Sequence, residues 1–147
     1  MELEQALRSV ELLEGLTESE IKKVAEICTE RQYPRGEKII KQGEWGDEMY
    51  IITQGFVEVS LDETKQAPPK VVVNLGPGQI TGEMALLDQG PRSATVKALS
   101  EPTIVQVIKR EGFETLCQED ANIGYKVMRN LAMDLSFKLR HRNIIER

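Results

Sequence analysis

The residues most able to do chemistry are Glu83 and Arg92, which lie close together in a segment rich in glycine and proline, residues 76–96. A guanidinium can donate two parallel hydrogen bonds to phosphate oxygens. A carboxylate can accept hydrogen bonds from the hydroxyls of a diol. A cation and a diol acceptor so close in sequence predict a site for a sugar phosphate.

The residues around this pair predict a short helix followed by a strand. Gly82 opens the run 83–87, which contains good helix formers and no β-branched residue. Turn residues end this helix, and the segment 93–98 has a strand pattern that Arg92 enters. We expect unpaired backbone N–H groups in the first turn of the helix to favour an anion.

Each of the two charges also has an explanation without a ligand. Glu83 can be an acidic residue of the kind favoured near a helix N-terminus. Arg92 can be a solvated charge on a strand, or the partner of Glu83 in an ion pair. Taken alone, the two residues leave the question of a ligand open.

The complete string is more specific than its two charges. It resembles the phosphate-binding cassette of cyclic-nucleotide-binding domains, of the type found in catabolite activator protein and protein kinase A regulatory subunits. The matching stretches of the cassette are residues 82–87 and 91–96. Upstream, the family pattern for the first strands is matched by residues 35–37, 42–47 and 50–59. The resemblance covers most of the chain.

The resemblance implies a mainly β fold, an eight-stranded jelly-roll barrel called a β-roll, with helices on both sides of it in sequence. We expect residues 1–147 to form a single stand-alone domain. Its parts would be helices over about 3–30, a β-roll over about 34–110 with the cassette at 82–95, and helices over about 111–146.

The resemblance also implies a role for each cassette residue. Glu83 would accept a hydrogen bond from the ribose 2′-hydroxyl, and Gly82 would allow close approach of the backbone. Arg92 would pair with the cyclic phosphate. Ser93 would donate its hydroxyl or its backbone N–H to the phosphate or the base.

Two further contributions to the site are implied in the same way. Backbone amides near Met84 and Ala85 would complete the anion site. In the family, a residue of the last helix folds over the base. Here the candidates are Arg142 and Asn143, with Arg140 as a less favoured one.

The implied ligand is a 3′,5′-cyclic nucleotide, with cyclic AMP favoured over cyclic GMP, and no cofactor or metal is expected. The family uses the position of Ser93 to bias the choice of base. This sequence departs from the family at Thr81, where an aromatic residue is common. That departure concerns packing beneath the cassette and leaves the charged contacts unaffected.

The rest of the chain supplies elements that could hold such a site. Short β-rich runs separated by glycine and proline, from Tyr33 to about residue 110, are typical of a sandwich or barrel. Before them, helical spacing predicts two helices, and Thr17 with Glu20 forms a capping box that starts the second. After them, a last helix is predicted over about 121–145.

Composition narrows the function classes. The chain has 147 residues and a net charge of −5, which argues against nucleic-acid binding through overall charge. Neither a signal peptide nor an apolar run long enough to cross a membrane is visible. Cys28 and Cys117 predict reduced thiols packed as small hydrophobes in helices. These features favour the cytoplasm, without direct DNA or membrane binding.

Other functions are weighed against cyclic-nucleotide sensing. Jelly-roll metalloenzymes usually need several histidines, and this chain has only His141, so we expect no catalysis. A scaffold that has lost its ligand would need neither Glu83 nor Arg92. The chain can also be a fragment of a larger cyclic-nucleotide-regulated transcription factor, kinase or channel.

The last helix suggests how the domain could act on others. Its apolar residues recur at steps of three and four, so it could pair with a second copy across a two-fold axis. A homodimer through this helix and an effector protein of unknown identity are therefore the expected partners. We expect the ligand signal to leave the domain through the same helix.

Overall fold

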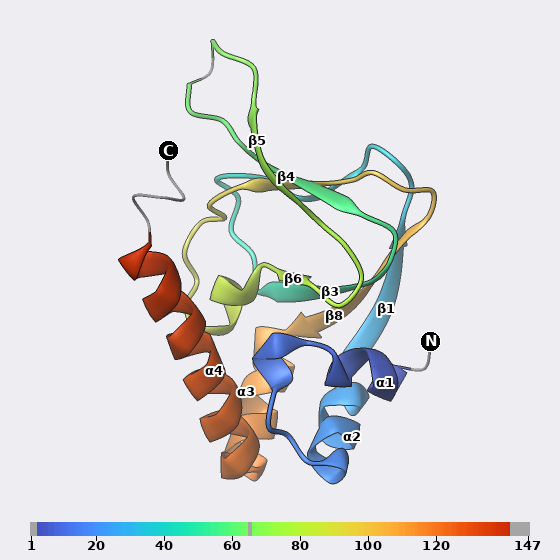
Figure 1. The fold of residues 1–147 in the computed structure, drawn as a ribbon, viewed down its shortest axis with the longest axis vertical. Helices are drawn as coiled ribbons and strands as arrows, with labels where there is room; N and C mark the ends of the chain where they lie inside the picture. Colours follow the sequence, from blue (N-terminus) through green and yellow to red (C-terminus); the bar gives the residue numbers. More distant parts are fainter. Residues whose placement is uncertain (1–2, 65, 142–147) are drawn as a thin grey trace.

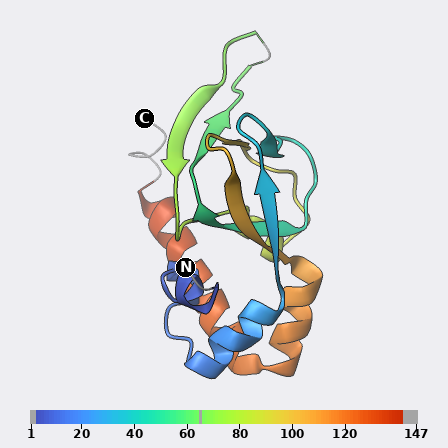
Figure 2. The same ribbon diagram turned by 90° about the vertical axis from the view of Figure 1, so that its right-hand side faces the viewer.

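The structure, a computed structural model, describes residues 3–64 and 66–141 and has its strands at one end and most helices at the other (Figure 1). A view turned by 90° shows the same division (Figure 2). The strands are β1 (Cys28–Tyr33), β2 (Lys38–Ile40), β3 (Glu48–Gln54), β4 (Val57–Leu61), β5 (Lys70–Leu75), β6 (Ile80–Thr81), β7 (Thr95–Ala98) and β8 (Thr103–Lys109). The helices are α1 (Leu3–Arg8), α2 (Glu18–Glu26), α3 (Arg110–Glu119) and α4 (Ala121–Arg140), with the 3₁₀ helices η1 (Glu11–Leu13) and η2 (Glu83–Leu86).

The strands of the described residues form two antiparallel sheets of four strands each. One sheet has the order β1-β8-β3-β6 and the other the order β2-β7-β4-β5. Buried side chains of both sheets meet inside the roll, and they are Tyr33, Ile40, Tyr50, Ile52, Val57, Val96, Ala98, Val105 and Val107. This arrangement confirms the predicted mainly β fold with helices at both ends.

Strand β3 is buried on both faces, which explains its nearly continuous apolar sequence. Met49 and Ile51 belong to the cluster that packs against the helices, whereas Tyr50 and Ile52 lie in the cluster inside the roll. Successive side chains of a strand point to opposite faces, so β3 contributes to both cores. It also pairs with β6, which leads into the cassette.

Helix α2 begins as predicted. The Thr17 hydroxyl accepts a hydrogen bond from the Glu20 N–H at 3.2 Å, and Glu20 Oε1 accepts one from the Thr17 N–H at 2.8 Å. The predicted continuation of helix to residue 30 is wrong, because β1 (Cys28–Tyr33) pairs with β8 along its whole length. That pairing stabilises an extended backbone which the local helical spacing does not reveal.

Both cysteines are free thiols that lie partly buried. Burial raises the pKa of the Cys28 thiol to about 12. Burial is also the first cause of the raised pKa of Cys117, followed by the charge of Asp120. The thiols are therefore packing groups, although only Cys117 lies in a helix.

Helix α4 runs from the level of α2 toward the cassette (Figure 1). Near its start, Lys126 Nζ contacts Glu20 Oε1 at 2.7 Å. Farther along, Asn130 Nδ2 donates hydrogen bonds to the carbonyl oxygens of Leu12 at 2.9 Å and Glu14 at 2.8 Å. These contacts fix α4 to α2 and η1 and leave its last turns beside the cassette.

Several boundaries near the site differ from the prediction. The helix of the cassette is the 3₁₀ helix η2, which ends at Leu86. Strand β7 begins at Thr95, so Arg92 and Ser93 precede it in an irregular segment. The two-residue strand β6 was not predicted, since it is too short to show a period. Among the described helices, none combines the length and the apolar character that a bilayer span requires.

Candidate functional site

Gly82 forms the turn on which the cassette is built. Its φ of 79° lies in the left-handed region, which favours glycine. A Cβ at this position would lie 3.0 Å from the Glu48 carbonyl oxygen and 3.0 Å from Arg92 Nη1. Glycine therefore allows both the turn and the close approach of β3 and Arg92.

The single turn of η2 satisfies part of its own backbone. The Ala85 N–H donates to the Gly82 carbonyl at 3.1 Å. We had expected this amide to be unpaired, and in the structure it is paired. Ala85 is buried, whereas Met84 is 45% exposed. In this structure Ala85 therefore supports the turn from inside and offers no unpaired donor.

The Arg92 guanidinium is held by backbone carbonyls and an aromatic ring. Nη2 donates to the Glu48 carbonyl at 2.7 Å and Nη1 to the Gly82 carbonyl at 3.5 Å. The guanidinium also lies over the Tyr50 ring, with Cζ 5.9 Å from the ring centroid. Within the described residues, none of the ion pairs neutralises Arg92 with a carboxylate. The cation is therefore fixed in place with no carboxylate counter-ion from the described part of the chain.

The carboxylate of Glu48 is bound elsewhere. Arg31 Nη1 and Nη2 donate to its two oxygens at 3.0 and 3.1 Å, and the Tyr50 hydroxyl donates to Oε1 at 2.8 Å. The hydrogen bonds from Arg31 are the first cause of a lowered pKa of Glu48, against the effect of burial. Burial, followed by the bond to Glu48, raises the pKa of Tyr50.

Glu83 is bound by a cation from α4. Lys138 Nζ lies 3.5 Å from Glu83 Oε1 and 3.0 Å from Asp134 Oδ2. Burial works to lower the pKa of Lys138, but the hydrogen bond to Asp134 and the charge of Glu83 raise it. The side chain of Glu83 is 15% exposed and that of Lys138 is 50% exposed, so Lys138 partly covers the carboxylate.

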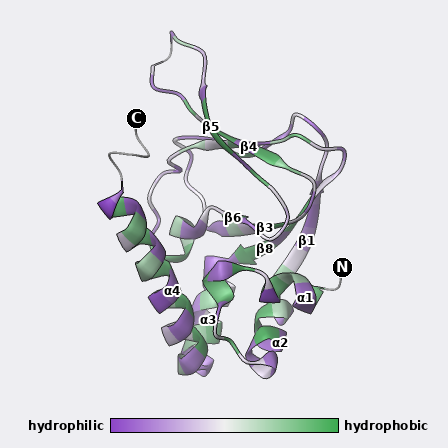
Figure 3. Ribbon diagram, viewed as in Figure 1, coloured by the Kyte–Doolittle hydropathy of each residue, from purple (hydrophilic) through white to green (hydrophobic). Residues whose placement is uncertain are grey.

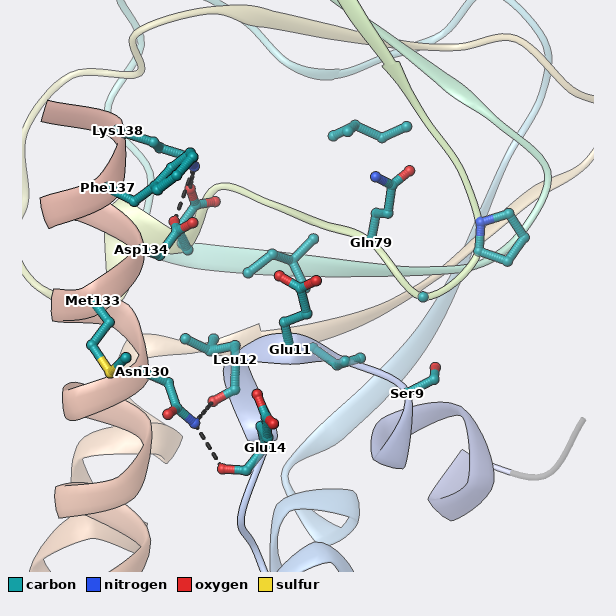
Figure 4. Close-up of a pocket in the computed structure, with 16 residues that line it drawn as sticks. Ser9, Glu11, Leu12, Glu14, Gln79, Asn130, Met133, Asp134, Phe137 and Lys138 are labelled. Atoms are coloured by element: carbon teal, nitrogen blue, oxygen red, sulfur yellow. Dashed lines mark hydrogen bonds and ion pairs between the residues drawn. The ribbon is translucent and has the colours of Figure 1, made fainter. Parts of the chain in front are cut away.

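A cavity of about 700 Å³ lies between η1, the β5–β6 turn and α4. In Figure 4, Phe137 and Lys138 project from α4 toward this cavity, and Glu11 and Gln79 face it from η1 and the turn. Glu83 lines the cavity but Arg92 does not. Arg92 and Glu83 are connected through Gly82 instead. The Gly82 carbonyl accepts a hydrogen bond from Arg92, and Glu83 is the next residue in the chain.

The remaining predicted residues fall in different places. Ser93 is exposed in the segment between Arg92 and β7, and Arg140 is exposed in the last turn of α4. The candidates Arg142 and Asn143 lie outside the described residues. Within the described part of the chain, no cluster of three or more His, Cys, Asp or Glu side chains could hold a metal ion.

Four residues that contact the site were not predicted from the sequence: Arg31, Glu48, Tyr50 and Lys138. Tyr50 lies in one of the upstream stretches that carry the resemblance, and Glu48 lies between two of them. The resemblance therefore covered their place in the chain but suggested no role for them. Arg31 and Lys138 gave no signal, because each reaches its partner only through the tertiary fold.

A model of the family described as "Cyclic nucleotide-binding domain" matches residues 30–120, which is more than half of the chain. The chain belongs to the cyclic nucleotide-binding domain family. This family is one of nucleotide-binding domains, and it is the family that the sequence of the cassette resembles.

Curated relatives include signalling proteins of two kinds. The chain is 44% identical over 95 residues to a cAMP-dependent protein kinase regulatory subunit of Mycosarcoma maydis, covering 65% of this chain and 18% of the relative. It is 34% identical over 107 residues to human cGMP-dependent protein kinase 2, covering 73% of this chain and 14% of the relative. The chain thus spans less than a fifth of the length of either protein.

Solved structures share the fold across nearly the whole chain. The catabolite activator protein of Thermus thermophilus has a TM-score of 0.81 and 30% identity, covering 91% of this chain and 60% of that one. The regulatory domain of Toxoplasma gondii PKA with cAMP has a TM-score of 0.78 and 29% identity, covering 91% and 48%. The N-terminal domain of a Streptomyces coelicolor transcriptional regulator has a TM-score of 0.83 at 23% identity, covering 93% and 94%.

Proposed function

We propose that this chain binds a 3′,5′-cyclic nucleotide at the cassette and acts as a regulatory sensor domain. The observation that carries the proposal is Arg92, a fixed guanidinium with no carboxylate partner among the described residues. A guanidinium held by carbonyls and a ring keeps further N–H donors for an anion. The cyclic phosphate supplies the missing counter-charge.

The other cassette residues take the rest of the ligand. Glu83 accepts hydrogen bonds from the ribose 2′-hydroxyl, for which it must exchange its contact with Lys138. Ser93 adds a hydroxyl or an N–H next to Arg92. Gly82 lets Arg92 and the Glu48 carbonyl come close to the cassette turn, where a side chain would meet both.

We favour cyclic AMP over cyclic GMP as the ligand, with no metal or cofactor and no catalysis. Support comes from the relatives named for cAMP-dependent kinases and from the Toxoplasma gondii structure with cAMP. The similarity to cGMP-dependent protein kinase 2 makes cyclic GMP the alternative. Arg142 and Asn143, which lie outside the described residues, stay the candidates for covering the base.

A thermal-shift panel tests the proposal. The purified chain is melted with cyclic AMP, cyclic GMP, cyclic dinucleotides and the linear monophosphates. A ligand that binds only the folded chain raises the melting temperature by mass action. Cyclic mononucleotides alone are expected to do so. A chain that responds to none of them would be a scaffold of the same fold.

Lys138 connects the cassette to α4, because it lies on that helix and pairs with Glu83. Because Lys138 and the ribose compete for Glu83, we expect Lys138→Met to tighten cyclic AMP binding by up to about fivefold, the scale of a partly exposed ion pair of about 1 kcal/mol. Isothermal titration calorimetry measures the change. Lys126→Met is the matched control, since Lys126 lies on the same helix but pairs with Glu20. Weaker binding by Lys138→Met would show instead that Lys138 contacts the ligand.

The outer face of α4 supports pairing with a second copy of the chain. Purple and green alternate along this helix in Figure 3. Of the apolar residues that recur at steps of three and four along α4, Val127 and Leu131 are buried in the chain's own core, and Met128 and Leu135 pack partly against it. Tyr125 is 68% and Leu139 65% exposed, so apolar side chains near both ends of α4 are uncovered in one chain.

We expect light scattering to show a homodimer for the wild-type chain and a monomer for Leu139→Glu. The new carboxylate would lose its water where the two α4 helices pack together, which opposes dimerisation. Met133→Glu serves as the control, since Met133 lies on the cavity side of the same helix. A wild-type chain that is monomeric at micromolar concentration would contradict pairing through α4.

A further inference from the structure

Glu48 binds Arg92 through its backbone, while its carboxylate is bound by other side chains. Glu48 offers Arg92 only its backbone carbonyl, at 2.7 Å. Its carboxylate is bound by both terminal nitrogens of Arg31, at 3.0 and 3.1 Å. The Tyr50 hydroxyl also donates to this carboxylate, at Oε1 and 2.8 Å, while the guanidinium of Arg92 lies over its ring.

This arrangement matters because a neutralised guanidinium is a poor phosphate ligand. The Glu48 side chain is only 17% exposed, and a carboxylate so covered needs a partner. Without Arg31, a change of Glu48 rotamer would bring the carboxylate toward the guanidinium that already holds its carbonyl. A carboxylate beside the Arg92 guanidinium would compete directly with an incoming phosphate for its positive charge.

We infer that Arg31 determines the phosphate affinity of the site by holding the Glu48 carboxylate away from Arg92. The inference rests on the proposed function and makes Arg31 a positioning residue, since it acts through Glu48. Tyr50 assists by binding the same carboxylate and by supporting Arg92 with its ring. One other cation lies near Glu48: Lys109, its exposed neighbour across the β3–β8 pair.

The test is a double-mutant cycle measured by calorimetry with cyclic AMP. Arg31→Met is expected to weaken binding by about tenfold or more, because Glu48 then pairs with Arg92. Glu48→Gln is expected to stay within about threefold of wild type, since the Arg92 contact uses the backbone. The double variant Arg31→Met/Glu48→Gln is expected to recover to within about threefold, because no carboxylate is left to compete.

Controls separate this role from general support of the fold. Thermal melts establish that each variant is folded at the assay temperature, and Arg31→Gln replaces Arg31→Met if the latter is not. Arg31→Lys keeps a cation beside Glu48 but loses the bidentate contact, so its affinity is expected to lie between those of wild type and Arg31→Met. Lys109→Met should leave the affinity unchanged.

Each outcome decides something. Binding by Arg31→Met equal to wild type would overturn the inference and leave the proposed function intact. A double variant as weak as Arg31→Met would overturn it too, because loss of support by β1 would then explain the effect. A wild-type chain that binds no cyclic nucleotide would overturn the proposed function and this inference with it.

Discussion

Replacing Arg92 with lysine is expected to weaken cyclic AMP binding by about ten- to a hundredfold, although the charge is kept. The guanidinium donates to two carbonyls, of Glu48 and Gly82, and still presents further donors to a phosphate. An ammonium has three donors on a single atom and cannot keep this planar geometry. The loss of a charge-assisted hydrogen bond, about 1.5–3 kcal/mol, sets the size of the effect.

Calorimetry on the wild type and on Arg92→Lys measures this difference. Arg35→Lys is the matched control, since Arg35 is exposed and its side chain donates only to the Leu99 carbonyl at 3.2 Å. Equal dissociation constants for wild type and Arg92→Lys would remove Arg92 from the binding site.

The second large effect is expected at Gly46, where a methyl group would occupy the place of the guanidinium. A Cβ at Gly46 would lie 2.6 Å from Arg92 Cζ. The obstructed group is the end of a flexible side chain, and Gly46 is not among the glycines with positive φ, so the backbone tolerates alanine. We therefore expect Gly46→Ala to reduce cyclic AMP affinity by about tenfold or more while changing stability by less than about 1 kcal/mol.

Comparison with Gly112→Ala isolates this effect. Gly112 lies in α3, and a Cβ there would be 3.8 Å from the nearest atom, so neither folding nor binding should suffer. Melting temperatures and calorimetric titrations are compared for both variants. Gly46→Ala with undiminished affinity would mean that the observed position of Arg92 is not the one that binds phosphate.

The cassette could be predicted from the sequence because its chemistry is local. Gly82 opens the short helix η2, as the helix formers after it predicted, and Glu83 follows it directly in the chain. Thr17 and Glu20 form their capping box for the same reason, since both partners lie within one helical turn. Signals of this kind need no knowledge of the remainder of the fold.

Contacts between distant segments could not be predicted in this way. Lys138 lies 55 positions from Glu83, so no local pattern could indicate their contact. Arg31 lies in β1, whose first three residues were predicted as helix because the pairing of β1 with β8 is invisible to a local pattern. The contacts of Arg31 and Lys138 with residues near the cassette were therefore missed.

A structure of the chain with cyclic AMP tests the central claim most directly. The account predicts phosphate oxygens within hydrogen-bond distance of the Arg92 guanidinium, and the ribose 2′-hydroxyl on the Glu83 carboxylate in place of Lys138. A nucleotide bound with its phosphate away from Arg92, while Glu83 still contacts Lys138, would contradict it.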